Sequence, residues 1–104
     1  MRRGEIWWAK LPEPAGKRPV LLLSRNEAYA VRNSVTAAEV TSRIRGIPVE
    51  VQLGLADGMP KECVVNLDTI ITITKSLIET RITALDNEKM KEVEKAIKFA
   101  LAIT

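Results

Sequence analysis

The sequence predicts a small, mainly β (α+β) fold: a strongly bent sheet or partly open barrel of six or seven strands, with one short connecting helix. Three observations support this fold class. Short runs rich in apolar and β-branched residues recur along the chain, turn-forming segments separate them, and a convincing long helical pattern comes only at the end. The length of 104 residues is typical of one domain, so we expect residues 1–104 to form a single domain.

The first third of the chain predicts two strands and a helix. Glu5–Leu11 is apolar and β-prone, and the loop Pro12–Gly16 ends it. Arg18–Ser24 does not alternate between polar and apolar residues, which predicts a strand buried on both faces. Pro19 fits near the start of a strand, where a missing N–H is tolerated. Arg25–Asn33 lacks strand character, and we expect about two turns of helix there.

The middle of the chain predicts further strands and one turn-rich connection. Alternation of apolar and polar residues in Ile47–Leu53 indicates a strand with one solvent-exposed face. Residues 54–60 (GLADGMP) have the composition of a turn. The other expected strands are Ser34–Ser42, the two β-branched segments at residues 63–67 (CVVNL) and 69–75 (TIITITK), and Arg81–Leu85.

The long C-terminal helix is predicted from both its start signal and its periodicity. Asp86 is suited to cap the first turn, with Leu85 and Met90 at the positions of a hydrophobic staple. Apolar residues then repeat at intervals of three and four, which predicts one apolar stripe facing the sheet. The stripe comprises Met90, Val93, Ile97 and Leu101.

Positive charge is concentrated in the first half of the sequence. Residues 1–45 carry nine Lys/Arg and four Asp/Glu, a net charge of +5, whereas residues 46–104 carry seven and nine, a net charge of −2. Seven of the eight arginines lie in the first half. If these guanidinium groups share a face, they indicate a nucleic acid or another polyanion as the partner. A solvated surface with extra charge is the alternative interpretation.

Several classes of chemistry are disfavoured by what the sequence lacks. There is no histidine, which removes the commonest general base and most zinc sites, and the scattered glycines form no phosphate-binding loop. The acidic residues show no metal-ligand spacing, so we expect no metal and no cofactor. Cys63 is the only cysteine and no stretch is apolar enough to span a membrane, so we expect a cytoplasmic protein.

Motifs along nearly the whole chain resemble the MazF/PemK toxins of type II toxin–antitoxin systems. The most specific are RGEIWW at residues 3–8, then Pro12, GKRPV at residues 16–20, and an apolar run that ends in Ser24. The second motif of the family, a Thr-Ser pair that ends a strand, is resembled by Val40–Ser42 with Pro48 and the alternating strand that follows. The remaining similarity lies in Cys63–Asp68 with Ile70 and Lys75, and in the helix from Asp86 to Ile103.

The resemblance implies an SH3-like barrel with a long C-terminal helix, assembled as a homodimer. It also implies metal-independent cleavage of single-stranded RNA at short recognition sequences, in messenger RNA or alternatively in ribosomal or transfer RNA. A cognate antitoxin would silence the toxin by laying a segment across the RNA groove. Arg18 matches the catalytic arginine of the family, and Thr41 with Ser42 matches the hydroxyl pair that contacts the scissile phosphate.

The residues themselves suggest how such a site would work. An arginine fork clamps phosphate oxygens and stays protonated, so Arg18 suits electrostatic stabilisation better than proton abstraction. The proton acceptor stays open: Glu13 is the nearest carboxylate in the sequence, and a substrate phosphate oxygen or water is the alternative. Further candidates are contacts that position the RNA backbone without reading its sequence. They are Lys17, Arg43, Arg45 and Lys75.

Two departures from the family pattern keep rival functions open. The Gly-Ser-Glu segment that many members carry before their arginine is missing, and Ile71 and Thr74 replace an Arg and an Asp. One rival is therefore an RNA-binding module that no longer cuts. The other is a gyrase poison of the CcdB type on a similar barrel; such toxins depend on an aromatic-bearing C-terminus, whereas this chain ends in Leu101–Thr104.

Overall fold

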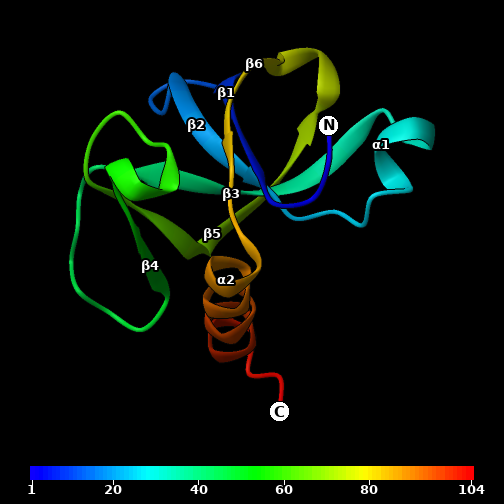
Figure 1. Cartoon of the computed structure of the whole chain (residues 1–104). Coiled ribbons are helices and arrows are strands. Elements are labelled where there is room, and N and C mark those ends of the chain that lie inside the picture. Colours follow the sequence, from blue (N-terminus) through cyan, green and yellow to red (C-terminus); the bar gives the residue numbers. More distant parts are fainter.

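The computed structural model describes all 104 residues as one curled antiparallel sheet with two helices (Figure 1). The six strands lie in the order β4-β5-β3-β2-β1-β6, and each neighbouring pair is antiparallel. This arrangement confirms the predicted fold class. The elements are β1 (Glu5–Lys10), β2 (Lys17–Leu22), α1 (Ala28–Val31), β3 (Ser34–Thr41), β4 (Glu50–Leu53), β5 (Cys63–Thr74), β6 (Ile78–Ala84) and α2 (Asn87–Ala100), with 3₁₀ turns at Leu55–Asp57 and Lys75–Leu77.

The sheet buries apolar side chains on both faces, and β2 contributes to each. Leu21 belongs to one core cluster, whereas Val20 and Leu22 belong to the other, and all three side chains are fully buried. This confirms the prediction that the apolar part of this strand is buried on both faces. Burying each such side chain contributes on the order of 1.5–3 kcal/mol to stability.

Helix α2 covers the first of these clusters from below, packing on β4 and β5 (Figure 1). Val93 and Ala96 are buried, and the Asp86 carboxylate accepts a hydrogen bond from the Lys89 N–H at 2.8 Å, as the capping prediction required. The predicted stripe was too long by one residue. The helix ends at Ala100, and the Leu101 side chain is 56% exposed beyond its last turn. Neither helix is long and apolar enough to cross a membrane.

The connecting helix α1 is shorter than the two turns expected. It is a single turn, because only Ala28 and Tyr29 are buried in it while Val31 is 77% exposed. A helix this short has little stability of its own and extends only as far as packing supports it.

Strand β4 also begins later than predicted, at Glu50 rather than Ile47. The Glu50 carboxylate accepts hydrogen bonds from the N–H groups of Arg45 and Gly46, at 3.0 and 2.9 Å. The Glu50 N–H turns back to the Ile47 carbonyl at 3.0 Å. These bonds hold residues 42–49 as a loop outside the sheet. Strand β6, in contrast, begins earlier than predicted, at Ile78.

The two β-branched segments predicted as separate strands form one strand, β5, with an excursion at their boundary. Val65 pairs with Val40 of β3, and Ile70 pairs with Ala38, so four residues of β5 (66–69) stand opposite the single residue Glu39. Buried Leu67 anchors this excursion, its N–H bound to the Val49 carbonyl at 2.9 Å. The β3–β5 ladder is therefore interrupted beside Glu39, and bulges of this kind often mark functional sites.

Candidate functional site

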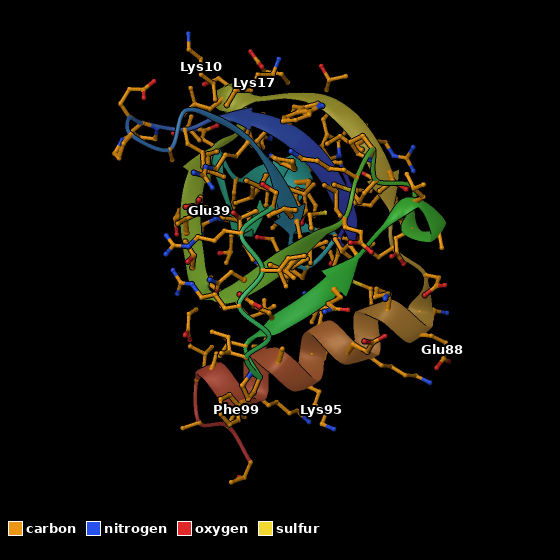
Figure 2. All side chains as sticks on the ribbon, turned by 90° about the vertical axis from the view of Figure 1, so that its left-hand side faces the viewer. Lys10, Lys17, Glu39, Glu88, Lys95 and Phe99 are labelled. Carbon is orange, nitrogen blue, oxygen red and sulfur yellow. The ribbon has the colours of Figure 1, made fainter.

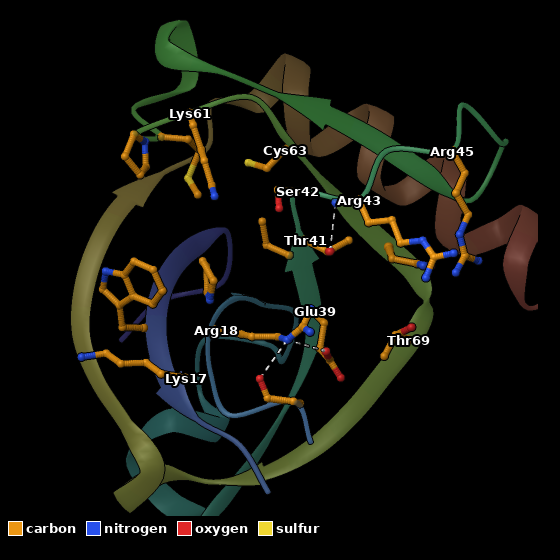
Figure 3. Close-up of a pocket in the computed structure, with 17 residues that line it drawn as sticks. Lys17, Arg18, Glu39, Thr41, Ser42, Arg43, Arg45, Lys61, Cys63 and Thr69 are labelled. Carbon is orange, nitrogen blue, oxygen red and sulfur yellow. Dashed lines mark hydrogen bonds and ion pairs between the residues drawn. The ribbon is translucent and has the colours of Figure 1, made fainter. Parts of the chain in front are cut away.

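The open side of the curled sheet holds a cavity of about 640 Å³ (Figure 3). Its lining includes five cationic side chains and one carboxylate, which leaves a net charge of +4 (five minus one). The cations come from three separate segments of the chain. They are Lys17 and Arg18 of β2, Arg43 and Arg45 of the β3–β4 loop, and Lys61 just before β5; the carboxylate is Glu39 of β3.

Arg18 extends from β2 into this cavity and is held by its Nε atom. Nε donates a hydrogen bond to the Ala15 carbonyl at 3.1 Å and lies 3.9 Å from Oε1 of Glu39 (Figure 3). The two terminal nitrogens make no hydrogen bond within the chain. The side chain is 38% exposed, so the guanidinium fork is fixed in direction and free to bind two oxygens of a phosphate.

Thr41 and Ser42 lie at the end of β3 and line the same cavity as Arg18. The Arg43 N–H donates to Oγ1 of Thr41 at 3.1 Å, which leaves the threonine hydroxyl proton available for another acceptor. Thr41 thus satisfies a turn, as such residues usually do, and still presents a donor to the cavity. The structure therefore brings together the three residues that the sequence assigned to the phosphate.

The four side chains that the sequence analysis named as contacts to an RNA backbone divide into two groups. Lys17, Arg43 and Arg45 line the cavity, whereas Lys75 lies outside it, where its Nζ donates to the Tyr29 carbonyl at 2.7 Å. Lys61 was missed, because a single lysine beside a turn carries no signal in the sequence. Figure 2 shows Lys17 at the top of the view, on the opposite side of the molecule from Phe99 near the C-terminal end of α2.

The carboxylate in the site is Glu39, not Glu13. Glu13 is exposed in the β1–β2 loop and does not line the cavity. Glu39 is two residues before Thr41, and side chains at this spacing in a strand share a face. This two-residue spacing from Thr41 was the signal that could have identified Glu39 from the sequence.

Two other features complete the chemistry of this region. Burial raises the pKa of the Cys63 thiol, and the Asp57 carboxylate adds to the rise, so this lining residue stays a neutral thiol at neutral pH. Ile71 and Thr74, which replace an Arg and an Asp of the family pattern, line a smaller adjacent cavity of about 410 Å³. The fold nowhere gathers three or more His, Cys, Asp or Glu side chains that could hold a metal ion.

A small β fold with a concave, strongly basic cavity, an arginine fork and adjacent hydroxyl donors has the features of the class of proteins that bind phosphate-bearing polyanions. The family model for the PemK-like, MazF-like toxin of type II toxin–antitoxin systems matches residues 2–101. The chain therefore belongs to this toxin family, which confirms the resemblance drawn from its motifs.

Individual relatives agree with this assignment. The "Probable endoribonuclease MazF5" of Mycobacterium tuberculosis is 33% identical over 100 residues, covering 95% of this chain and 91% of the relative. The solved structure of Mycobacterium tuberculosis toxin MazF-mt6 superposes with a TM-score of 0.89 at 28% identity, covering 96% of this chain and 98% of that one. A mycobacterial endoribonuclease solved in complex with its cognate antitoxin gives a TM-score of 0.88 at 25% identity, covering 100% and 97%.

Proposed function

We propose that this chain is the toxin of a type II toxin–antitoxin system and acts as a metal-independent, sequence-selective endoribonuclease on single-stranded RNA. The observation that carries the proposal is the meeting of Arg18, Thr41 and Ser42 in a cavity lined by five cations and one carboxylate. Relatives that share a third of their sequence with this chain are named as endoribonucleases, which supports the same activity here.

The reaction would use the 2′-hydroxyl of the substrate as the nucleophile. The 2′-oxygen forms a bond to the adjacent phosphorus while the bond to the 5′-oxygen breaks, which leaves a 2′,3′-cyclic phosphate and a 5′-hydroxyl. The intervening phosphorane carries two negative charges. The Arg18 fork and the Thr41 and Ser42 hydroxyls would donate hydrogen bonds to its oxygens, and fixed donors of this kind stabilise a developing charge strongly.

Neighbouring phosphates of the RNA would bind the remaining cations. Lys17, Arg43, Arg45 and Lys61 line the cavity around Arg18 and would hold the strand in place without reading its bases. Single-stranded RNA fits this arrangement, because its flexible backbone can follow a basic concave surface.

The proposal extends to the partners and location of the toxin. A cognate antitoxin would cover the basic cavity with a segment of its own chain, and the mycobacterial endoribonuclease solved in complex with its cognate antitoxin supports such a partner. We further propose that the toxin is a cytoplasmic homodimer, as the family resemblance implies.

Incubation of the purified protein with a long single-stranded RNA in excess EDTA tests the activity. Discrete fragments that end in 2′,3′-cyclic phosphate are expected. Because Arg18 would act on the transition state, Arg18→Ala should fold and dimerise normally yet cleave about 10²–10³-fold more slowly. Arg25→Ala is the matched control, since Arg25 is exposed and lies outside the cavity.

The rival functions give different results in the same assay. RNA that is bound but stays intact would identify a binding module that no longer cuts. Intact RNA together with inhibition of gyrase would identify the other class of toxin. Equal cleavage by Arg18→Ala and Arg25→Ala would remove Arg18 from the site.

A further inference from the structure

Glu39 occupies a special place in the basic cavity. It is the only carboxylate among the lining residues, and its side chain is only 19% exposed. It also borders the smaller adjacent cavity, so it stands where the two meet. No residue of β5 pairs with it, because the four-residue excursion of β5 lies opposite. Glu39 therefore has a paired neighbour only on the β2 side, where Val20 stands opposite it, and its carboxylate lines the cavity.

Cleavage through the 2′-hydroxyl needs a proton acceptor, and the other groups of the cavity are poorly suited to that task. Lysines and arginines are already protonated at neutral pH, and hydroxyl groups are very weak bases. Burial raises the pKa of the Cys63 thiol, which keeps it protonated. The chain contains no histidine. Glutamate is ordinarily ionised at neutral pH and can accept a proton directly.

The position of Glu39 relative to Arg18 suits this role. Oε1 lies 3.9 Å from Nε of Arg18, and the two terminal nitrogens make no hydrogen bond within the chain and are free for phosphate oxygens. In a reactive conformation the 2′-oxygen lies about 3–3.5 Å from the phosphorus. A phosphate bound by the terminal nitrogens of Arg18 would bring the adjacent 2′-hydroxyl to the part of the cavity that Glu39 lines.

We infer that Glu39 is the general base of the cleavage reaction, a role that rests on the proposed function. Its carboxylate takes the proton of the 2′-hydroxyl, the electron pair of that O–H bond forms the new bond to phosphorus, and the bond from phosphorus to the 5′-oxygen breaks. The departing 5′-oxygen takes a proton from water. Glu39, now a neutral acid, returns its proton to solvent before the next cycle.

A purely orienting role for Glu39 is the alternative, and the contacts of Arg18 disfavour it. The Ala15 carbonyl already holds Nε of Arg18 at 3.1 Å, a shorter contact than the 3.9 Å to Glu39. Arg18 is thus fixed without the carboxylate. A negative charge beside the phosphate also opposes RNA binding, so a residue kept there only for structure would weaken the complex.

The test compares wild type, Glu39→Gln and Glu39→Asp. The probes are a short RNA that contains the mapped cleavage site and the same RNA with one 2′-deoxynucleotide at that site, which binds but is not cut. Single-turnover rates on the first are measured across pH, and Kd values are measured for the second. Glu79→Gln is the matched control, because Glu79 pairs with Lys17 at 3.5 Å but does not line the cavity.

Glu39→Gln should cleave about 10²–10⁴-fold more slowly. It should also lose the rise of rate with pH on the acidic side, and bind the 2′-deoxy probe at least as tightly as wild type. Glu39→Asp should keep that acidic limb at a reduced rate, and Glu79→Gln should cleave as wild type does.

Three results would overturn the assignment. The first is near-normal cleavage by Glu39→Gln, and the second is an acidic limb of the pH–rate profile that is unchanged in this variant. The third is a parallel loss of RNA binding and cleavage in Glu39→Gln, which would indicate an orienting role instead. Intact RNA with the wild-type chain is a distinct outcome: the proposed function itself then fails, and the role of Glu39 fails with it.

Discussion

At the scale of single residues, Glu5 of β1 links this strand to β6. Its carboxylate accepts hydrogen bonds from the Trp7 indole at 3.0 Å, the Arg2 N–H at 2.8 Å and Nε of Arg81 at 3.1 Å. Burial acts to raise the pKa of Glu5, but these donors outweigh it and hold the pKa below its ordinary value. Glu5 therefore favours the folded state while it is ionised.

The lowered pKa of Glu5 makes its contribution to stability depend on pH. A carboxyl whose pKa is lower in the folded state stabilises the fold above its unfolded pKa of 4.5, and this contribution is lost as the pH falls through the folded value. Glu5→Gln should thus lower the free energy of unfolding by about 1–2 kcal/mol at neutral pH and by much less in strong acid. Urea titrations at both pH values, with exposed Glu62→Gln as control, measure the difference; an equal loss at both would contradict the argument.

The residues of the candidate site were predictable to different degrees. Arg18, Thr41 and Ser42 could be predicted because their motifs lie within single segments of sequence, and all three line the cavity. Lys61 was not predicted, and Lys75 was predicted but lies outside the cavity, because the positions of both relative to the cavity depend on packing between distant segments. Glu39 is an intermediate case. The alternation of side chains along a strand predicts that it shares a face of β3 with Thr41, but its contact with Arg18 depends on the pairing of β2 with β3.

At the scale of elements, the turn before β5 shows how a local signal and a distant contact combine. Residues 54–60 were predicted as a turn, and Gly58 adopts a φ of +88° there, a conformation that favours glycine. The hydroxyl of Thr83 in β6 donates to the Asp57 carbonyl at 3.0 Å. A Cβ at position 58 would overlap the Thr83 side chain. No local sequence pattern could have revealed that a side chain of β6 is hydrogen-bonded to this turn.

Gly58→Ala should therefore destabilise the protein through both backbone strain and the overlap with Thr83. We expect the free energy of unfolding to fall by about 1–3 kcal/mol. Gly54→Ala is the control, because Gly54 has an extended backbone and its Cβ position has no neighbour within 4 Å. Urea unfolding of both variants measures the effect. Similar stabilities for the two would show that the turn relaxes freely.

At the scale of the whole molecule, folding concentrates charge that the sequence spreads over three segments. The strand order places β2 beside β3, and the loop after β3 brings Arg43 and Arg45 to the cavity that holds Arg18. The apolar runs and the capped helix were enough to predict the fold class and a set of six or seven strands, of which the structure has six. The curl of the sheet, and hence the cavity, depends on register shifts in β1–β6 and β3–β5 that no periodicity encodes.

This concentration of charge predicts a strong salt dependence of RNA binding. Binding of single strands loses about 0.7 logarithmic units of affinity per phosphate contact for each tenfold rise in salt, so four or five contacts give a slope of about −3 to −3.5. Replacing Arg43 and Arg45 together by alanine should reduce the slope by about 1.4. Fluorescence anisotropy with the 2′-deoxy probe measures it, with Lys95→Ala/Lys98→Ala on exposed faces of α2 as control. A slope unaffected by the arginine pair would place the RNA elsewhere.

The excursion of β5 beside Glu39 separates the lining of the cavity from the pairing of β3 with β5. Its four residues are held by buried Leu67 and by a turn in which the Asp68 N–H donates to the Asn66 side chain at 2.9 Å, rather than by the β3–β5 ladder. Asn66 and Thr69 both line the cavity, so substitutions at these two positions would change its lining without altering the β3–β5 pairs on either side.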